Sequence, residues 1–455
     1  MKTKKRESGP SVSPARAAAF GILIRMERES SYAADLLHSK AHASLSSADH
    51  SLTTELVMGV LRWRPLLDSQ IAKASSQPLV RLDLEILTAL RIAVYQLRWL
   101  SRIPARAAIH ESVELVKRAR KWSAASFVNA VLRKLAIGTG GDVIPPAIDG
   151  ASVGTLAASA AHPEWLVERW VRAYGLEAAI QICRHNQSIP VTALRLRDPK
   201  AEEQLRAEGI ELVPGALLTS ARRVLRGDVT GSSAYRSGRS VIQDEASQLV
   251  AALVGRGDSI LDCCAAPGGK TLAIADHNAN SKITAIDLHP HRARLLRRLV
   301  QAANDNIFVV SADARDLPFA DCFDRVLADV PCSGTGTLSR NPEIKWRLKA
   351  DDLADLQPRQ LAILRSAMDR VTTGGRLVYS TCSLEREENE DVVEAALVGD
   401  TAFRVIDCET ELEKLRQEGE LVWDQPNPLT RGPYLRTLPE VHPCDGFFAA
   451  ILERI

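Results

Sequence analysis

Cysteine is scarce in this sequence, with 8 in 455 residues, and the spacing of the cysteines excludes two common uses. A disulfide framework requires a denser set in a shorter chain, and neither a CxxC pair nor a Cys/His cluster at zinc spacing is present. Cys263 and Cys264 are adjacent and do not readily bridge. We therefore expect free thiols in a reducing compartment and no metal site.

Long apolar runs are also missing. No stretch of about 18 apolar residues is available to span a bilayer. The N-terminus has the positive start of a signal peptide without its apolar segment. These absences predict a cytoplasmic protein with no membrane partner, in which residues 1–11 form a disordered basic tail.

Two nucleotide-binding signatures are incomplete. The loop 262–271, DCCAAPGGKT, ends like the phosphate loop GxxxxGK[ST], but Cys264 stands where the first glycine belongs and Pro267 removes a backbone N–H. The dinucleotide signature GxGxxG is absent. ATP, GTP and dinucleotides are therefore not expected. A tight loop in which Gly268 and Gly269 allow close approach suits an adenosine ligand without a phosphate chain.

Negative charge is scarce in the first third of the chain. Residues 1–140 carry 22 Lys and Arg against 11 Asp and Glu, a net charge of +11, and the remaining 315 residues have a net charge of −9. This asymmetry predicts a polyanionic partner for the first part, although a solvated helical face has the same composition. The candidates for phosphate contacts are Arg62, Arg91, Arg106, Lys117, Arg118 and Arg133.

Apolar periodicity predicts six or seven helices and no strand between residues 12 and 140, as in an antiparallel bundle. Residues 141–240 are assigned to a Gly- and Pro-rich linker and a small α+β subdomain. In residues 241–455 strands and helices alternate, which predicts an α/β fold with a doubly wound parallel sheet. The expected strands are 259–264, 282–288, 307–313, 324–330 and 376–382, and the expected helices are 240–254, 271–277, 291–303, 353–371 and 387–398. A last strand at 446–454, after a long irregular loop, is expected to insert antiparallel.

Two cysteines follow two of these strands. In FDRVLADVPCSGTG, Asp329 stands at the end of one strand and Cys332 follows it. In GGRLVYSTCS, Cys382 stands at the end of another strand. The carboxyl ends of parallel strands meet at one edge of a sheet, where such folds place their chemistry. A lone cysteine is more often a small buried hydrophobe, but the matched contexts favour a single reactive site.

Acidic residues follow the same edge. Asp287 ends the second strand, where a carboxylate accepts ribose hydroxyls, and Asp313 ends the third, where it accepts from an adenine amino group. An adenosine ligand with a positive sulfur, S-adenosylmethionine, fits this arrangement better than NAD or ATP. A thiolate that adds to C6 of a pyrimidine makes C5 nucleophilic, whereas N- or O-methylation requires no cysteine. From the residues alone, Cys332 and Cys382 are equal candidates for this nucleophile.

The motifs DCCAAPGGKT, DVPCSGTG, NPEIKW and STCSLEREENE resemble those of the Sun/NOP2 family of RNA (cytosine-5-)methyltransferases. The helical motifs DHSLTTELVMGVLR, RIAVYQL, RIPARAAIHESVEL and FVNAVLR resemble the NusB-type RNA-binding domain of its bacterial small-subunit rRNA member, the 16S rRNA methyltransferase B type. The resemblance extends from about residue 12 to the C-terminus. It implies a Rossmann-like S-adenosylmethionine-dependent methyltransferase domain at 241–455, preceded by an all-α NusB-like domain at 12–140.

The resemblance also implies a role for each site residue. Cys382 is the expected nucleophile, Cys332 assists product release, and Lys270 and Asp329 orient the cytosine. The residues expected to hold S-adenosylmethionine are Cys264, Ala265, Ala266, Pro267, Gly268, Gly269, Lys270, Asp287, Asp313 and Asp329. The implied activity is methylation of C5 of a cytidine in 16S ribosomal RNA by a monomer. One alternative is methylation of a cytosine in tRNA or 23S rRNA. Another is a non-catalytic RNA-binding assembly factor, but such a factor would not need both cysteines and every strand-end aspartate.

Three positions depart from the family's pattern. Cys263 stands where relatives often carry an apolar residue, and Arg197 replaces the asparagine of an LRVN pattern. The segment SLEREENE replaces VLPEENE after Cys382. The missing proline predicts a looser loop there, with residues 387–389 in place.

Overall fold

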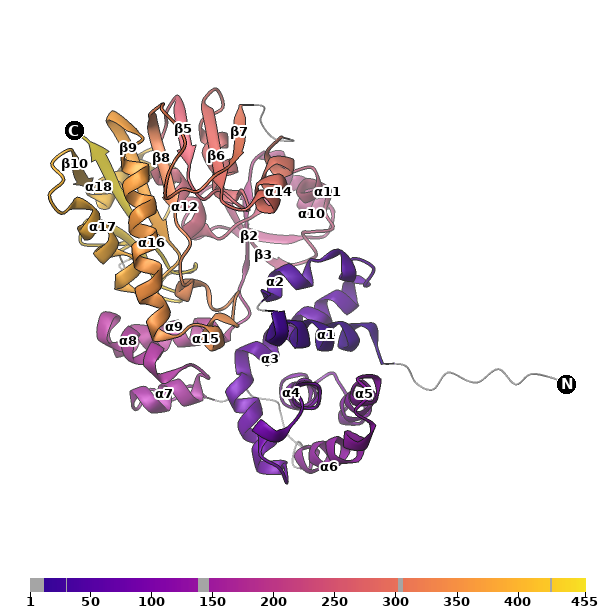
Figure 1. Cartoon of the computed structure of the whole chain (residues 1–455). Helices are drawn as coiled ribbons and strands as arrows, with labels where there is room; N and C mark the ends of the chain where they lie inside the picture. Colours follow the sequence, from indigo (N-terminus) through magenta and orange to yellow (C-terminus); the bar gives the residue numbers. More distant parts are fainter. Residues whose placement is uncertain (1–11, 30, 138–146, 302–305, 426–427) are drawn as a thin grey trace. The chain divides into compact units, whose positions relative to one another are not determined.

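The structure is a computed structural model that describes residues 12–29, 31–137, 147–301, 306–425 and 428–455 (Figure 1). The expected tail at 1–11 and part of the expected linker lie outside these ranges. The chain divides into two compact units. The first contains residues 1–176 and the short segment 341–347, and the second contains residues 177–340 and 348–455. In the described part of the chain, no helix is long and apolar enough to cross a membrane. The four-part domain division stays a prediction.

The first unit is helical. Its helices are α1 (Pro14–Glu29), α2 (Ala33–Leu37), α3 (Ser47–Ala74), α4 (Leu84–Trp99), α5 (Ala105–Arg118), α6 (Ala125–Ala136), α7 (Val153–Ser159) and α8 (Glu164–Tyr174), and the segment 341–347 adds α15 (Ile344–Arg347). Aliphatic side chains of α1 and of α3 to α6 form one buried core. The all-α prediction for 12–140 is confirmed for the described part of that range, where α1 to α6 lie.

Two residues that were predicted to contact phosphate lie in this core instead. Arg62 and Arg91 are only 3% and 6% exposed. Arg91 donates from Nε and Nη2 to the two carboxylate oxygens of Asp68, each at 2.7 Å, and burial lowers the pKa of Arg62. The prediction is therefore wrong for both, because a guanidinium inside the core does not reach RNA. Lys117 is half-buried and bonds to Glu114 at 2.7 Å. The exposed candidates that remain are Arg106, Arg118 and Arg133.

Helix α3 contains Pro65 in its interior. Proline has no backbone N–H, so the carbonyl oxygen of Leu61, four residues earlier, lacks its helical donor. The indole N–H of Trp346, from the segment 341–347, donates to this oxygen at 2.6 Å. The ammonium of Lys345, which is 2% exposed, donates to two further carbonyl oxygens of the unit at 3.0 and 3.1 Å. Trp346 thus supplies the donor that the interrupted helix requires, and Lys345 adds two bonds to backbone carbonyl oxygens of the same unit.

The second unit contains a small antiparallel sheet. In the described residues its strands are β1 (Thr192–Leu196), β2 (Glu211–Pro214), β3 (Ala221–Arg226) and β4 (Ser240–Ile242), in the order β2-β3-β1-β4. Helix α9 (Leu176–Gln187) leads into it, and α10 (Lys200–Ala207) and α11 (Ser233–Arg236) accompany it. Residues 240–242 were predicted as helix but pair with β1 as a strand. Helix α12 (Glu245–Leu253) begins only after Asp244, whose side chain caps it by accepting from the N–H of Ala246.

Nine strands form the larger sheet in the described residues. They are β5 (Ser259–Asp262), β6 (Lys282–Asp287), β7 (Ile307–Ser311), β8 (Phe323–Asp329), β9 (Val371–Thr381), β10 (Phe403–Ile406), β11 (Thr430–Arg431), β12 (Tyr434–Thr437) and β13 (Phe447–Arg454). The order is β11-β12-β13-β9-β8-β5-β6-β7, and β10 pairs with β13. Strands β5 to β9 run parallel, and β13 is antiparallel to β9 as predicted. The strand order changes sense between β5 and β8, the switch point at which such sheets bind ligands.

Helices cover both faces of this sheet (Figure 1). Helices α12, α13 (Gly269–His277), α14 (Pro290–Gln301) and α18 (Cys408–Gln417) share one core, and α16 (Ala350–Met368) and α17 (Glu390–Leu397) share the other. The doubly wound architecture is confirmed. The prediction of an irregular loop before the last strand is wrong, because that region contains β10, α18, β11 and β12. These strands have only two to four residues, too few for an alternating pattern.

Candidate active site

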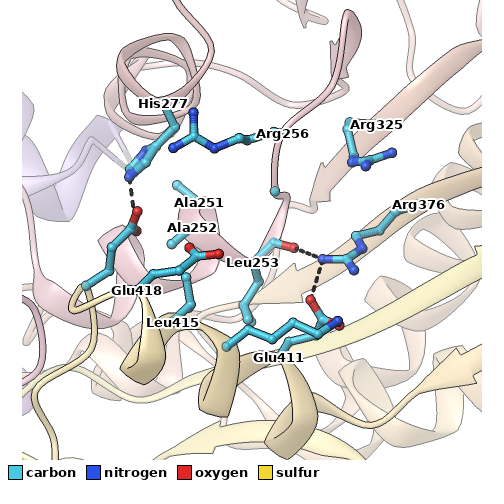
Figure 2. Close-up of a pocket in the computed structure, with 13 residues that line it drawn as sticks. Ala251, Ala252, Leu253, Arg256, His277, Arg325, Arg376, Glu411, Leu415 and Glu418 are labelled. Carbon is cyan, nitrogen blue, oxygen red and sulfur yellow. Dashed lines mark hydrogen bonds and ion pairs between the residues drawn. The ribbon is translucent and has the colours of Figure 1, made fainter.

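A pocket of about 300 Å³ lies near the amino ends of the central strands (Figure 2). Arg325, near the start of β8, lines it together with its cross-strand partner Arg376. Arg376 bonds to Glu411 at 2.9 Å and donates to the carbonyl oxygen of Leu253 at 3.2 Å. None of the residues predicted for the site lines this pocket. Those residues lie at the carboxyl edge of the sheet.

The two cysteines that were predicted to share a site are adjacent. Strand β8 ends at Asp329 and β9 at Thr381, so neighbouring parallel strands deliver Cys332 and Cys382 to one place. Their Sγ atoms lie 3.3 Å apart, and both residues are free thiols. The hydrogen bond with Cys382, together with burial, holds the pKa of Cys332 well above its ordinary value. Cys332 therefore keeps its proton near neutral pH.

An ion pair spans the switch point next to these thiols. Lys270, in the first turn of α13, donates from Nζ to Oδ2 of Asp329 at 2.8 Å, and the hydroxyl of Ser380 donates to Oδ1 at 2.7 Å. Burial lowers the pKa of Lys270, but Asp329 and then Cys382 raise it by more, so the net pKa lies above its ordinary value. The site thus holds a fixed ammonium and a fixed carboxylate beside the cysteines.

Glu388 holds together the loops that carry the two cysteines. Its side chain is fully buried. Oε1 accepts from the backbone N–H of Ser333 at 2.8 Å and from Nε2 of Gln360 at 2.9 Å. Oε2 accepts from the hydroxyls of Ser333 and Ser383. Four donors from three segments therefore converge on one carboxylate. The sequence showed Glu388 after the Thr-Cys motif but did not indicate this role.

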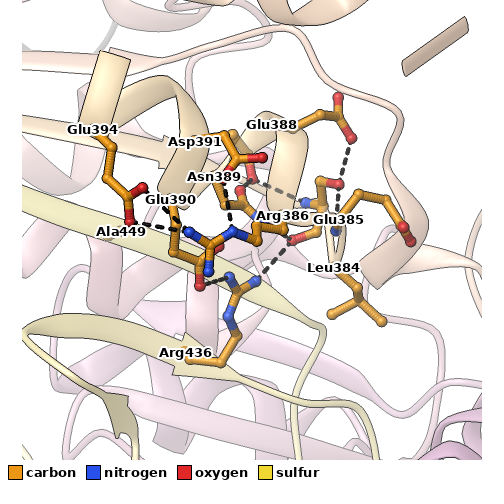
Figure 3. A network of polar contacts seen from close by, with 12 residues as sticks. Leu384, Glu385, Arg386, Glu388, Asn389, Glu390, Asp391, Glu394, Arg436 and Ala449 are labelled. Carbon is orange, nitrogen blue, oxygen red and sulfur yellow. Dashed lines mark hydrogen bonds and ion pairs between the residues drawn. The ribbon is translucent and has the colours of Figure 1, made fainter. Parts of the chain in front are cut away.

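Further hydrogen bonds order the loop after Cys382 (Figure 3). The carbonyl oxygen of Ser383 accepts from Nδ2 of Asn389 at 2.9 Å and from Nη1 of Arg436 at 3.2 Å. Arg436 also bonds to Glu390 at 2.9 Å. Side-chain contacts therefore hold this loop without the ring of a proline, and the looser loop stays a prediction.

The last glycine of the DVPCSGTG motif is required by close packing. A Cβ atom at Gly336 would lie 2.1 Å from the carbonyl oxygen of Gly446. The N–H of Gly336 donates to the carbonyl oxygen of Cys382 at 2.9 Å, and its own carbonyl oxygen accepts from the N–H of Gly446 at 2.8 Å. These contacts fix the loop of Cys332 against the residue that follows β9.

The predicted cofactor loop follows β5 at the switch point. Gly268 has a φ of +115°, and a Cβ atom there would lie 2.8 Å from Cδ1 of Leu296, so the position requires glycine. Arg292 donates to the carbonyl oxygen of Ala266 at 2.9 Å. Cys263 is buried among apolar residues, which explains why it can replace an apolar residue, whereas Cys264 is half-buried.

The two predicted aspartates of β6 and β7 have different partners. Asp287 is buried at the end of β6, where it accepts from the N–H of His289 at 2.9 Å and lies 3.4 Å from Nη1 of Arg292. Because Arg292 also bonds to Ala266, it joins Asp287 to the cofactor loop. Asp313, which follows β7, bonds instead to its neighbour Arg315 at 2.6 Å, and this hydrogen bond lowers the pKa of Asp313.

A buried carboxylate at the end of β5 was not singled out from the sequence. Oδ2 of Asp262 accepts from the hydroxyl of Thr271 at 2.7 Å, and Oδ1 has no hydrogen-bond partner in the described residues. Burial raises the pKa of Asp262 to about 7. Its position as the first residue of the cofactor motif was the available signal. An unsatisfied acceptor, a glycine cradle and carboxylates at strand ends together fit S-adenosylmethionine.

Arg197, which stands in place of the family's asparagine, makes a structural contact. Its guanidinium donates from Nη2 and Nε to the carboxylate of Asp276 at 2.7 and 2.9 Å, and Arg195 bonds to the same carboxylate. The arginine thus ties the small sheet to α13. Within the described ranges, no group of three His, Cys, Asp or Glu is arranged to hold a metal ion.

Three family models match successive parts of the chain. They are the NusB family at residues 13–136, the Methyltr_RsmF/B-like, ferredoxin-like domain at 162–227 and the 16S rRNA methyltransferase RsmB/F at 252–453. The larger sheet with its helices is therefore a Rossmann-like methyltransferase fold.

Curated relatives match along nearly the whole chain. The probable ribosomal RNA small subunit methyltransferase B of Bacillus subtilis is 37% identical over 96% of this chain and 98% of its own. The ribosomal RNA small subunit methyltransferase B of Vibrio cholerae is 32% identical over 96% of this chain and 97% of its own. The chain belongs to the RsmB/F family of 16S rRNA methyltransferases, and the resemblance inferred from the motifs is confirmed.

The fold is shared with solved structures of lower identity. The crystal structure of PH0851 is 23% identical, with a TM-score of 0.78 over 98% of this chain and 100% of that one. The crystal structure of NSun6 from Pyrococcus horikoshii with SFG is 19% identical, with a TM-score of 0.55 over 64% of this chain and 98% of that one.

Proposed function

We propose that this protein transfers a methyl group from S-adenosylmethionine to C5 of a cytidine in 16S rRNA, through a covalent bond between Cys382 and C6 of the base. The observation that carries the proposal is the pair of free thiols, with Sγ atoms 3.3 Å apart, beside the Lys270–Asp329 ion pair. The names of the two relatives support small-subunit rRNA as the substrate.

The thiols supply what C5 methylation requires. The Cys382 thiolate forms a bond to C6, and the electron pair of the C5–C6 double bond makes C5 nucleophilic. When bound, S-adenosylmethionine supplies the methyl group that C5 takes. A base then removes the C5 proton, the electrons of the C5–H bond restore the C5–C6 double bond, and the bond between C6 and sulfur breaks with its electron pair returning to the sulfur of Cys382. Lys270 and Asp329 offer a donor and an acceptor to the polar edge of the cytosine.

Cys332 acts in the last step. Its raised pKa keeps the thiol protonated, and its sulfur already lies within hydrogen-bond distance of the Cys382 sulfur. The S–H donor stabilises the negative charge that returns to Cys382 when the bond to C6 breaks. This role explains why a second cysteine accompanies the nucleophile.

The cofactor is held by the loop and the strand-end carboxylates. The proposed residues are Cys264, Ala265, Ala266, Pro267, Gly268, Gly269, Lys270, Asp287, Asp313 and Asp329. To this set we add Asp262, whose buried Oδ1 lacks a partner in the described residues.

The test separates the two cysteines. We expect Cys382→Ala to lower methyl incorporation into 16S rRNA by at least about a thousandfold while cofactor affinity changes by less than severalfold. We expect Cys332→Ala to accumulate a protein–RNA adduct that survives denaturing gels. The exposed Cys322 provides the control, Cys322→Ala. Wild-type turnover in Cys382→Ala would refute the nucleophile, and no adduct in Cys332→Ala would refute its role in release.

The substrate is tested in cells. Bisulfite sequencing of total rRNA and tRNA, with and without the gene, should show a single cytidine in 16S rRNA that loses protection. Loss of protection in tRNA or 23S rRNA would change the substrate but keep the chemistry. Complete retention of protection would refute the enzyme and favour an assembly factor.

A further inference from the structure

Helix α14 concentrates positive charge in the acidic part of the chain. Residues 288–301 contain four arginines, two histidines and no Asp or Glu, although residues 141–455 as a whole have a net charge of −9. The charge of this helix is therefore a local feature and not a consequence of overall composition.

The helix has two distinct faces. Ala293, Leu296 and Val300 are buried against the sheet. The opposite stripe, which recurs every three or four residues, is exposed, and Leu295 and Leu299 in it are 60% and 44% exposed. We call this stripe the α14 face; it consists of His291, Arg294, Leu295, Arg298 and Leu299.

The arginines of α14 differ in what they bind. Arg292 bonds to Asp287 and to the carbonyl oxygen of Ala266, and Arg297 donates to the carbonyl oxygen of Val309 at 2.8 Å. Arg294 and Arg298 are exposed and form no ion pair with any residue that the structure describes. The two arginines of the α14 face thus keep their charge available for a ligand.

The α14 face lies next to the proposed cofactor loop. Leu296 and Leu299 pack so closely on Gly268 that a Cβ atom there would lie 2.8 and 3.0 Å from their methyl carbons. The helix also packs on β7, the edge strand of the sheet. Figure 1 shows α14 beside β6 and β7. A polyanion on this face would run along the border of the proposed site.

We propose that the α14 face binds the phosphodiester backbone of the RNA substrate beside its target cytidine. Arg294 and Arg298 contact phosphates, and Leu295 and Leu299 cover ribose and base edges. Arginine is suited to this because its planar fork binds phosphate oxygens, and phosphate contacts set the register of an RNA without reading its sequence. The inference rests on the proposed function in taking RNA as the ligand.

The test uses the full-length protein and a double variant, Arg294→Gln with Arg298→Gln. Its matched control is Arg404→Gln with Arg416→Gln, which also removes two positive charges from the same unit. Unlike the arginines of the α14 face, Arg404 and Arg416 form ion pairs with glutamates. The probe is a 16S rRNA fragment, and its binding is measured by fluorescence anisotropy at several salt concentrations.

We expect the α14 variant to weaken RNA binding about tenfold and to lower the slope of log K against log salt by about 1.4, since each single-strand phosphate contact contributes about 0.7. The control should keep the wild-type slope. In methylation assays KM for RNA should rise with kcat unchanged, because the face touches no reacting atom. A wild-type salt slope in the α14 variant would overturn the proposal.

Two further outcomes are distinguishable. If the wild type and the control variant self-associate in sedimentation but the α14 variant does not, the α14 face binds a second copy of the chain, and the RNA proposal is overturned. If no RNA is methylated but the salt slope still falls in the α14 variant, the proposed function fails while the RNA-binding face stands. Circular dichroism and thermal unfolding verify that both double variants are folded.

Discussion

The helical unit and the carboxyl edge of the sheet both contain backbone polar groups that regular secondary structure leaves without a partner, but the first supplies a side-chain donor and the second a side-chain acceptor. In the helical unit, Pro65 removes the donor for the carbonyl oxygen of Leu61, and the segment 341–347 brings the indole N–H of Trp346, which donates to that oxygen. At the sheet edge, the loops after β8 and β9 present one N–H and two hydroxyl donors, and Glu388 accepts from all three and from Gln360 of α16. An interrupted helix requires donors, and a loop that leaves a strand requires an acceptor.

The largest effect is expected at the acceptor. Glu388→Gln replaces a carboxylate oxygen with an NH2 group that faces other donors. We expect the free energy of unfolding to fall by about 3 kcal/mol and kcat to fall with it, because the cysteine loops lose their common anchor. Denaturant unfolding and methyl-transfer kinetics measure both.

The control for this substitution is Glu394→Gln, since Glu394 pairs with Arg386 on the surface. Surface pairs contribute about 0 to 1 kcal/mol. If Glu388→Gln lowered the free energy of unfolding as little as the control does, the carboxylate of Glu388 would not be the anchor of the cysteine loops.

A smaller effect is expected at the donor. Trp346→Phe leaves the carbonyl oxygen of Leu61 without its donor and should lower the free energy of unfolding by about 1 to 2 kcal/mol. In a Pro65→Ala background the cost should shrink by about 1 kcal/mol, because the substituted residue restores the helical N–H.

The four proteins of this double-mutant cycle are the wild type, Trp346→Phe, Pro65→Ala and the double variant. Denaturant unfolding of all four measures the coupling free energy between positions 65 and 346. Trp122→Phe, at an exposed tryptophan of the same unit, provides the control. Equal costs in both backgrounds would show that the indole does not substitute for the missing N–H.

The smallest effect concerns pH. Burial raises the pKa of Asp262 from 3.8 to about 7. The folded state therefore holds this proton more tightly than the unfolded chain, and the resulting stability is fully present below pH 3.8 and is lost as the pH rises through 7. For one such group the loss between pH 6 and pH 8 is about 1 kcal/mol.

Asp262→Asn should remove this share of the pH dependence in denaturant unfolding at pH 6 and pH 8. Burial also raises the pKa of Asp244 to about 7, so the difference between wild type and variant isolates Asp262. Asp316→Asn, at an exposed position, should keep the wild-type dependence. An unchanged dependence in Asp262→Asn would show that this carboxylate is not protonated in the folded state.

Most of the fold could be predicted because its signals are local. The alternation of strands and helices in 241–455 and the helical periodicity of 12–140 are visible in short windows of sequence. Strands β10 to β12 escaped prediction because two to four residues carry no period. Strands β10 and β12 add to β13, and β11 adds to β12, so all three depend on the position of β13 on the antiparallel side of the sheet, which is a tertiary fact.

The candidate site was predictable in its parts but not in its connections. Cys332 and Cys382 were assigned to one site because each follows a parallel strand, and their Sγ atoms lie 3.3 Å apart. Glu388 escaped because its partners Ser333 and Gln360 lie 55 and 28 residues away in the sequence. Hydrogen bonds over such separations leave no periodic signal.

The sequence by itself determined which side chains are present at the strand ends, since residue type and position after an apolar run are local properties. Only the tertiary structure decided which charges are available to a ligand. Arg62 and Arg91 come from the strongly basic part of the chain yet are buried, whereas Arg294 and Arg298 come from the acidic part and are exposed. The physical reason is that burial depends on which face of a helix packs against distant elements, and net charge contains no information about that face.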